Sequence, residues 1–248
     1  MQNQQPSTLK EIRVHGTQDF PCAFYQTGTR IKGNMVKHHW HEEVELLYFS
    51  GGEFCLEVNM ERFNISEECF YVINPGELHS ISVEKNGGCV ENAVVFHMDM
   101  LSSAYALDQI QTNLIQPVQN GSIQFPRCLR KNEPAFEPVR KSYEEIRNVF
   151  GGDSFRENYY DGEAVTDDIT RQLFIKSALL RILAVLSANN LFEVTEKNHD
   201  HRIETIKTTL TYIQENYKEK IYIRDLAGLI GMNAVSYTHL RAHETTLH

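Results

Sequence analysis

Four residues of the chain are of the types that bind divalent transition metals, and their spacing suggests that they meet. His39, His41 and Glu45 lie in the pattern G-x5-H-x-H-x3-E-x6-G over residues 33–52, and His79 follows later. Imidazole nitrogens and carboxylate oxygens are ligands that Fe, Mn, Ni and Zn accept in proteins. If residues 37–49 form one strand, alternate side chains share a face, so the first three point the same way. The sequence therefore predicts a site of three histidines and one carboxylate.

Two kinds of site are compatible with these side chains. In one, His39, His41, Glu45 and His79 hold a divalent ion. In the other, the same groups line a metal-free pocket and hydrogen-bond a small-molecule ligand. Glu43 shares the predicted face and could add a contact. No Ser/His/Asp or Cys/His arrangement typical of a nucleophilic enzyme stands out, and the glycine pairs lack the strand–glycine–helix context of a phosphate loop.

The elements that must position these residues can be read from the residue pattern. Short runs rich in β-branched and aromatic residues, separated by turn residues, favour an antiparallel sandwich or barrel. The expected strands are 23–27, 37–49, 53–59, 62–65, 69–73, 79–83 and 90–97. Apolar residues then recur at helical spacing over 134–150 and 168–190. The second helix is apolar over more than one stripe, which predicts burial against the sheets and against a neighbouring helix or a second subunit.

Composition narrows the class of protein. The 248 residues carry a formal net charge of −9, which argues against a chain that coats nucleic acid broadly. Five cysteines are dispersed without a CxxC pair, which favours reduced thiols and a cytoplasmic location. No apolar run reaches the roughly 18 residues of a membrane-spanning helix. The N-terminal residues also lack the layout of a signal peptide.

The pattern of residues 33–52 is also that of the first conserved motif of the cupin barrels. The second cupin motif is present in part: Pro75, Gly76 and His79 are in place, but the leading glycine is missing and Val83 replaces the usual asparagine. The strings HHWHEEVELLY (38–48) and NPGELHS (74–80) resemble, more specifically, the effector domain of AraC-type transcriptional regulators. Residues 206–233, which end in IRDLAGLIGMN, resemble the opening of the helix-turn-helix DNA-binding domain of that family. The resemblance covers residues 10–233.

The resemblance implies an α+β fold: an N-terminal cupin-like antiparallel β-barrel followed by helices, then a partial all-α helix-turn-helix region. The implied divisions are an effector-binding barrel at 10–130, a helical dimerisation region at 131–190, a linker at 191–201 and an incomplete DNA-binding domain at 202–248. The protein would be a regulator and not an enzyme. A small-molecule effector, a sugar or other metabolite, would bind in the barrel at the four site residues and control how a homodimer meets double-stranded DNA.

The last residues, 234–248, depart from the family pattern. The string VSYTHLRAHETTLH resembles translated sequencing-adapter DNA, which predicts that the tail is foreign and that this truncated chain binds no DNA by itself. The alternative is a divergent recognition helix with Ser236 at its N-cap and Tyr237 and Arg241 on one face. In that case these three residues would contact DNA.

A different class of function also fits the barrel motif. A metal-dependent cupin enzyme, such as a dioxygenase or isomerase, would use His39, His41, Glu45 and His79 as its metal ligands. The helical last third of the chain and the IRDLAGLIGMN string count against an enzyme, because a single-barrel enzyme has no use for them. The sequence identifies neither the effector nor the operator.

Overall fold

The computed structural model of the protein describes residues 9–29, 31–86, 89–105, 107–151, 168–195 and 200–229. They belong to two compact units, one of residues 13–196 and one that combines residues 1–12 with 197–248. Ser236, Tyr237 and Arg241, the DNA-contact residues expected from the sequence, lie outside the described residues. Among the helices that are described, none is both long enough and apolar enough to cross a membrane.

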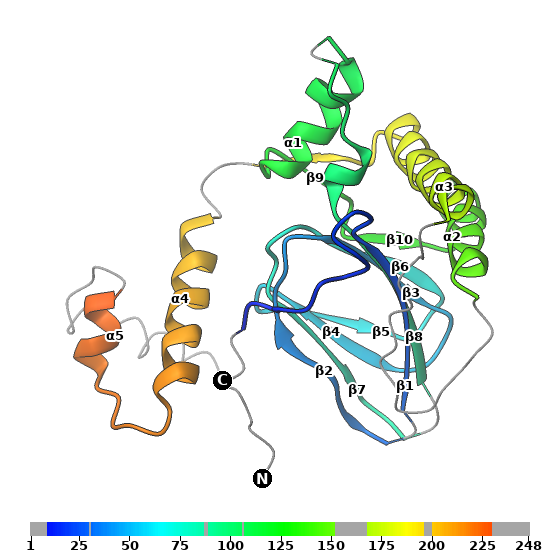
Figure 1. The fold of residues 1–248 in the computed structure, drawn as a ribbon. Helices are drawn as coiled ribbons and strands as arrows, with labels where there is room; N and C mark the ends of the chain where they lie inside the picture. Colours follow the sequence, from blue (N-terminus) through cyan, green and yellow to red (C-terminus); the bar gives the residue numbers. More distant parts are fainter. Residues whose placement is uncertain are drawn as a thin grey trace. The chain divides into compact units, whose positions relative to one another are not determined.

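Two antiparallel sheets form the body of the larger unit (Figure 1). The five-stranded sheet has the order β1-β8-β3-β6-β10 and the four-stranded sheet the order β2-β7-β4-β5. The strands of the first are Cys22–Thr29 (β1), Cys89–Phe96 (β8), Val44–Phe49 (β3), Cys69–Ile73 (β6) and Cys128–Arg130 (β10). Those of the second are Gly33–His39 (β2), His79–Val83 (β7), Phe54–Val58 (β4) and Glu61–Ile65 (β5). The predicted fold class, cupin-like antiparallel sheets followed by helices, is confirmed.

The strand β3 shows that the five-stranded sheet is buried on both faces. All six of its residues are buried, and their side chains alternate between two apolar cores. Leu47 and Phe49 belong to the core between the two sheets. Leu46 and Tyr48 belong to a second core on the opposite face. Glu45 has the same parity as Leu47, so its carboxylate points into the space between the sheets.

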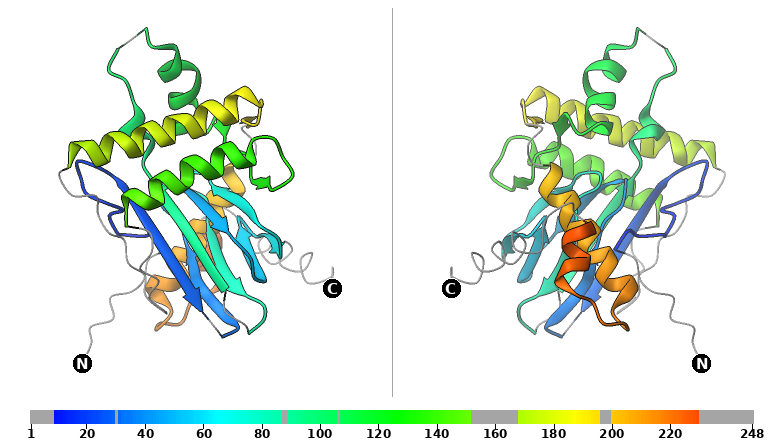
Figure 2. Two further views of the ribbon diagram at one scale, coloured as in Figure 1. Left: turned by 90° about the vertical axis from the view of Figure 1, so that its right-hand side faces the viewer. Right: turned by 90° about the vertical axis from the view of Figure 1, so that its left-hand side faces the viewer.

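Two helices, α2 (Phe136–Val149) and α3 (Ile169–Ala188), pack together over the outer face of the five-stranded sheet (Figure 2). The aromatic ring of Tyr143 on α2 lies 5.3 Å from the rings of both Tyr48 and Phe70 on the sheet. This aromatic cluster holds α2 against β3 and β6, because such ring pairs stabilise the packing by more than the burial of their apolar area does.

The helix α3 is apolar on more than one side, as its sequence predicts. It buries one face, which includes Ala178, Leu179, Ile182, Leu183 and Leu186. Four further apolar side chains of α3 remain exposed: Ile169, Leu173, Phe174 and Leu180. The first turn is capped by Asp168, whose carboxylate accepts hydrogen bonds from the backbone N–H groups of Thr170 and Arg171 at 2.9 and 3.3 Å.

Short elements connect the sheets with these helices. After β8 come η1 (Met98–Leu101), the π-helix η2 (Gln111–Ile115) and α1 (Gln116–Gln119). The strand β9 (Ile123–Gln124) then pairs with β11 (Glu193–Val194), which follows α3. β11 lies in the stretch 191–201 that the sequence predicts to be a linker, so the first residues of this stretch are held by strand pairing.

The smaller unit contributes two described helices, α4 (Asp200–Asn216) and α5 (Ile223–Leu229). The carboxylate of Asp225 accepts a hydrogen bond of 3.0 Å from the backbone N–H of Tyr222, just before α5. Leu226 and Ala227 are buried. This arrangement fits the first helix and the supporting helix that the sequence resemblance implies.

Candidate functional site

The structure brings the three predicted histidines together and sets Glu45 beside two of them, and we call the four residues the His/Glu cluster. His39 ends β2 and His79 begins β7, opposite each other in the β2–β7 pairing, with ring centroids 4.2 Å apart. The His41 ring lies 5.1 Å from that of His79. A ligand nitrogen of each of the three rings lies within 4.8 Å of the others. The Oε2 atom of Glu45 is 3.0 Å from Nε2 of His79 and 3.5 Å from Nε2 of His41.

The strand that the sequence predicts to bring these residues together is wrong. The sequence predicts one strand over 37–49, but β2 ends at His39 and His41 lies in the connection to β3. Register shifts in the β2–β7 pairing mark bulges, which re-aim side chains locally. Glu43 therefore does not join the cluster from the same face. Its Oε2 atom is 3.6 Å from Nδ1 of His41, whereas the cluster lies at the Nε2 side of that ring.

Each histidine of the cluster is oriented by a backbone carbonyl. The Nδ1 atoms of His39, His41 and His79 contact the carbonyl oxygens of Lys37, Glu43 and Glu77 at 2.8, 3.2 and 2.9 Å. Because a carbonyl oxygen only accepts, each Nδ1 must carry the proton and donate. In a neutral ring, Nε2 then presents a lone pair. Metal-binding histidines are commonly fixed in this way by a hydrogen bond from the second ring nitrogen.

The cluster is buried and holds a charge. His41, Glu45 and His79 are 4%, 6% and 1% exposed. Burial by itself raises the pKa of the Glu45 carboxyl, but the His41 and His79 imidazoles beside it outweigh burial and hold that pKa well below its usual range. The facing atoms Oε2 of Glu45 and Nε2 of His79 are both buried and make no hydrogen bond among the described residues. Lone pairs and a carboxylate thus converge, an arrangement that fits a cation.

A second buried carboxylate, Glu91, was not singled out by the sequence. It lies on β8 opposite Thr27 of β1 and Phe49 of β3, and it is 2% exposed. Burial, and to a lesser extent the charge of Glu45, raise the pKa of Glu91 well above its usual range, which keeps this side chain protonated. The only signal in the sequence is an acidic residue inside the apolar run of the expected strand 90–97.

His15 is a further buried residue beside the cluster. It is 1% exposed, its ring centroid is 5.3 Å from that of His41, and its Nδ1 atom is 2.8 Å from the hydroxyl of Tyr25. The sequence separation between His15 and the motif is long and follows no pattern. No local spacing rule could therefore have placed it here.

The loop of residues 74–79, which carries His79, is held by a buried ion pair. The Arg127 guanidinium donates to both carboxylate oxygens of Glu77, with Nη1 2.7 Å from Oε2, and also to the Val72 carbonyl at 2.5 Å. Glu77 Oε2 accepts a further hydrogen bond of 2.8 Å from the Asn74 backbone N–H. The side chains of Glu77 and Arg127 are 8% and 26% exposed. Breaking such an ion pair lowers the free energy of unfolding more than breaking an exposed ion pair does.

The same loop touches two histidines of the cluster. The Glu77 carbonyl accepts from Nδ1 of His79, and the backbone N–H of Gly76 donates to the His41 carbonyl at 2.7 Å. Gly76 has a φ of +78°, which glycine adopts without the strain of a side chain. A movement of this loop would therefore displace both rings.

A chain of contacts leads from this loop to the end of the larger unit. The Asn74 side-chain oxygen accepts a hydrogen bond of 2.8 Å from the Phe125 backbone N–H, and the Phe125 ring lies 5.3 Å from that of Phe192. Phe125 directly follows β9, and Phe192 directly precedes β11. The backbone N–H of Thr195 donates to the Ser122 carbonyl at 3.0 Å. The loop that carries His79 is thus linked, through Asn74, Phe125 and Phe192, to the segment from which the chain continues toward α4.

Arg127→Met tests the ion pair that holds the loop. The substitution leaves the Glu77 carboxylate buried without its partner, so we expect a loss of about 3 kcal/mol in the free energy of unfolding, measured by urea denaturation. The matched control is Arg140→Met, which breaks an exposed pair with Glu137 on α2 and should cost less than about 1 kcal/mol. Equal losses in the two variants would contradict a structural role of the Glu77–Arg127 pair.

Glu91→Gln tests the buried protonated carboxyl. The unfolded chain releases this proton near the ordinary pKa of 4.5, whereas the folded chain retains it. Above that pH the folded state binds more protons than the unfolded state, so the free energy of unfolding of the wild type falls as pH rises. A glutamine does not titrate, so the variant lacks this fall. In urea unfolding with EDTA present, Glu91→Gln should gain stability relative to wild type between about pH 5 and about pH 8. Glu61→Gln, at an exposed position of β5, is the control. A pH-independent difference for Glu91→Gln would refute this account.

Comparison with known proteins bears on the larger unit directly. Residues 27–148, which contain the His/Glu cluster, match the family model of the AraC-like ligand binding domain. The uncharacterized HTH-type transcriptional regulator YdeC of Bacillus subtilis (strain 168) is 25% identical over 227 residues. That similarity covers 88% of this chain and 69% of the relative.

Solved structures show more distant likenesses. Unsaturated fatty acid-bound wild-type ToxT from Vibrio cholerae strain SCE256 is 9% identical with a TM-score of 0.39, over 90% of this chain and 73% of that one. A predicted oxalate decarboxylase from Thermotoga maritima is 24% identical with a TM-score of 0.29, over 30% of this chain and 67% of that one. These scores carry no argument about function. Residues 27–148 therefore match an AraC-like ligand binding domain, within a chain that is similar over most of its length to an HTH-type transcriptional regulator.

Proposed function

We propose that this regulator senses a divalent transition metal ion held by His39, His41, Glu45 and His79. The observation that carries the proposal is the meeting of three imidazoles with a buried carboxylate, in which Nε2 of His79 lies 3.0 Å from Oε2 of Glu45. In a neutral ring Nδ1 donates to a carbonyl and Nε2 is an acceptor, so these two facing atoms need a bound cation, or a second proton on the ring, between them. Three imidazoles and a carboxylate suit Fe, Mn, Ni or Zn.

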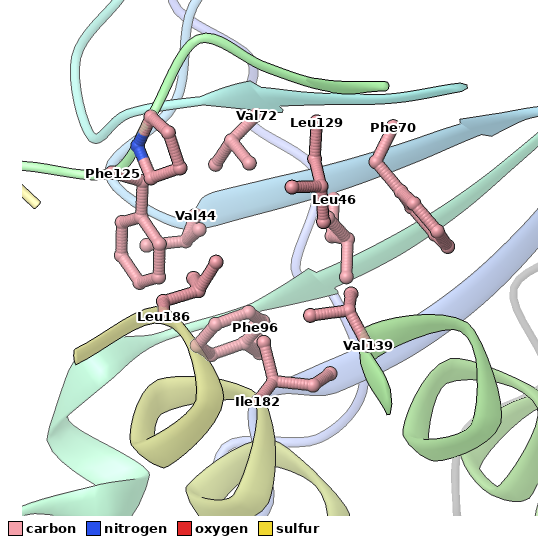
Figure 3. Close-up of a pocket in the computed structure, with 11 residues that line it drawn as sticks. Val44, Leu46, Phe70, Val72, Phe96, Phe125, Leu129, Val139, Ile182 and Leu186 are labelled. Atoms are coloured by element: carbon pink, nitrogen blue, oxygen red, sulfur yellow. The ribbon is translucent and has the colours of Figure 1, made fainter. Parts of the chain in front are cut away.

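The packing around the His/Glu cluster suits an ion at these four residues. The space between the two sheets is filled by an apolar core that includes Leu47, Phe49, Phe54 and Tyr71. A cavity among the described residues lies on the other face of the five-stranded sheet, has a volume of about 20 Å³, and is lined by apolar side chains (Figure 3). Pockets for organic ligands usually measure about 300 Å³ or more.

The same packing argues against the rival proposal of a metal-dependent dioxygenase or isomerase. Such an enzyme needs room for an organic substrate beside its metal. In the described part of the chain, the ligands Glu45 and His79 adjoin packed strands, with Glu45 opposite Ile73 and Val95. We propose that the bound ion joins β2, β3 and β7 and neutralises Glu45, and that this regulator performs no turnover.

The proposed response to the ion is a change in the affinity of the intact protein for double-stranded DNA. Any effector acts in this way only if it binds two states of the protein unequally. The contacts from the loop 74–79 through Phe125 to Phe192 and β11 offer a route by which ion binding could bias the chain that leads to α4.

We also propose that the protein is a homodimer that pairs through α3. Ile169, Leu173, Phe174 and Leu180 are 70%, 62%, 58% and 43% exposed on one helix. Their spacing places Ile169, Leu173 and Leu180 along one stripe. A second copy would bury this stripe, as the wide apolar face of the helix predicts.

Metal analysis tests the ion site. After dialysis against equimolar Mn²⁺, Ni²⁺ or Zn²⁺, the wild-type protein should retain about one ion of at least one of these metals per chain, measured by mass spectrometry and titration calorimetry. Glu45→Gln and His79→Ala each remove a ligand and should weaken binding at least ~10-fold, as even supporting residues of metal sites do. His97→Ala is the control, because His97 caps η1 outside the cluster. Undiminished binding in both ligand variants would sink the proposal.

Sedimentation analysis tests the dimer. The wild-type protein should sediment as a dimer at micromolar concentration, and Leu173→Glu should weaken association at least ~10-fold, because it places a charge in the proposed apolar contact. The matched control is Leu107→Glu, at a leucine that is 75% exposed in a loop away from α3. A monomeric wild type, or a dimer unaffected by Leu173→Glu, would rule out pairing through this face.

A further inference from the structure

Two cysteines of the five-stranded sheet are diagonal neighbours on one face. The strands β6 and β10 pair in a register that sets Cys69 opposite Arg130 and Tyr71 opposite Cys128. Residues opposite each other in an antiparallel pair share a face, and so do residues two apart on one strand. Cys69 and Cys128 therefore project from the same face as diagonal neighbours.

The two thiols have different surroundings. Cys69 is 6% exposed and belongs to the core between the sheets. Cys128 packs against that core but is partly accessible. The Cys69 thiol and the Tyr71 hydroxyl donate to the sulfur of Cys128 and, with the nearby Arg130, lower the pKa of Cys128 to about 7 in spite of its partial burial. A thiolate is the nucleophilic form of cysteine.

We propose that Cys69 and Cys128 form a peroxide-sensitive dithiol, in which Cys128 is the attacking cysteine and Cys69 the resolving one. In the first step, the Cys128 thiolate attacks one oxygen of hydrogen peroxide. The S–O bond forms, the O–O bond breaks, and hydroxide leaves and takes up a proton as water. In the second step, the Cys69 sulfur attacks the sulfur of Cys128, the S–O bond breaks, and a second water leaves. Two thiols are oxidised by two electrons in total, and an external thiol reverses the reaction by exchange.

The other described thiols do not share these features. Cys22 is fully buried, and burial raises the pKa of its thiol well above its usual value. Cys55 lies on β4, with Asn64 and Ser82 opposite it on the neighbouring strands. Only the β6–β10 pair, among the described residues, combines a partly accessible thiol with a second thiol beside it on the same face. Oxidation should therefore be selective.

The test is peroxide oxidation of the full chain at neutral pH with EDTA present, followed by alkylation and mass spectrometry under non-reducing conditions. We expect loss of two thiols, one linked peptide pair containing Cys69 and Cys128, and full recovery with dithiothreitol. Cys128→Ser should slow thiol loss at least tenfold. Cys69→Ser should instead accumulate a Cys128 sulfenic acid that dimedone traps, and Cys55→Ser should behave as wild type.

A second measurement needs no variant. The rate of iodoacetamide alkylation at Cys128 of the wild-type protein, followed by peptide mass, should rise with pH around an apparent pKa of about 7. The proposal is overturned if peroxide links other cysteines or none, if Cys128→Ser loses thiols within twofold of the wild-type rate, or if Cys128 alkylation titrates like an ordinary thiol, near pH ~8.5.

Discussion

The rest of the domain depends on one buried charge. This charge is the carboxylate of Glu45, which lies between two apolar sheets. Taking a carboxylate out of water is costly unless opposite charge or hydrogen bonds compensate it. Ile73 and Val95, its neighbours across the sheet, offer neither. His41 and His79 are the polar groups that reach it. Backbone carbonyls hold Nδ1 of both rings so that each Nε2 faces the carboxylate, an arrangement that the proposed metal ion would complete.

This constraint extends outward through the loop 74–79. The loop can hold His79 in place only because Glu77 is itself held by Arg127. Arg127 immediately precedes Cys128, so the segment that supports the proposed ion site also carries the proposed attacking thiol. If both proposals hold, metal and peroxide act on the same short stretch between β9 and β10. The strand β9, which precedes that stretch, is paired with β11, beyond which the chain continues to the smaller unit.

The sequence predicted the members of the cluster better than their arrangement. A motif with recognisable spacing contains His39, His41, Glu45 and His79. The turn residues between short apolar runs predicted an antiparallel fold. The predicted continuous strand over residues 37–49 was wrong. Bulges and the β2–β7 pairing, and not strand alternation, bring His39 to His79. Bulges of this kind depend on tertiary contacts and leave no pattern that a single sequence reveals.

Other members of the site left little or no signal in the sequence. His15 and Arg127 look ordinary in their local context, and Glu91 stands out only as an acidic residue inside an apolar run. Their roles come from the pairing of distant strands and from burial, as for Glu91 opposite Thr27. The helix α3 is the opposite case, because the helical spacing of its apolar residues predicted its wide apolar face.

The central claim is that the His/Glu cluster holds a metal ion, and X-ray absorption spectroscopy of the metal-loaded protein tests it most directly. The account predicts a first shell of nitrogen and oxygen atoms at about 2.0–2.2 Å, with the multiple-scattering signature of three imidazoles. Glu45→Gln should keep the imidazole signature while the carboxylate contribution is lost. A spectrum dominated by sulfur ligands, or one without histidine scattering, would place the metal elsewhere and contradict the account.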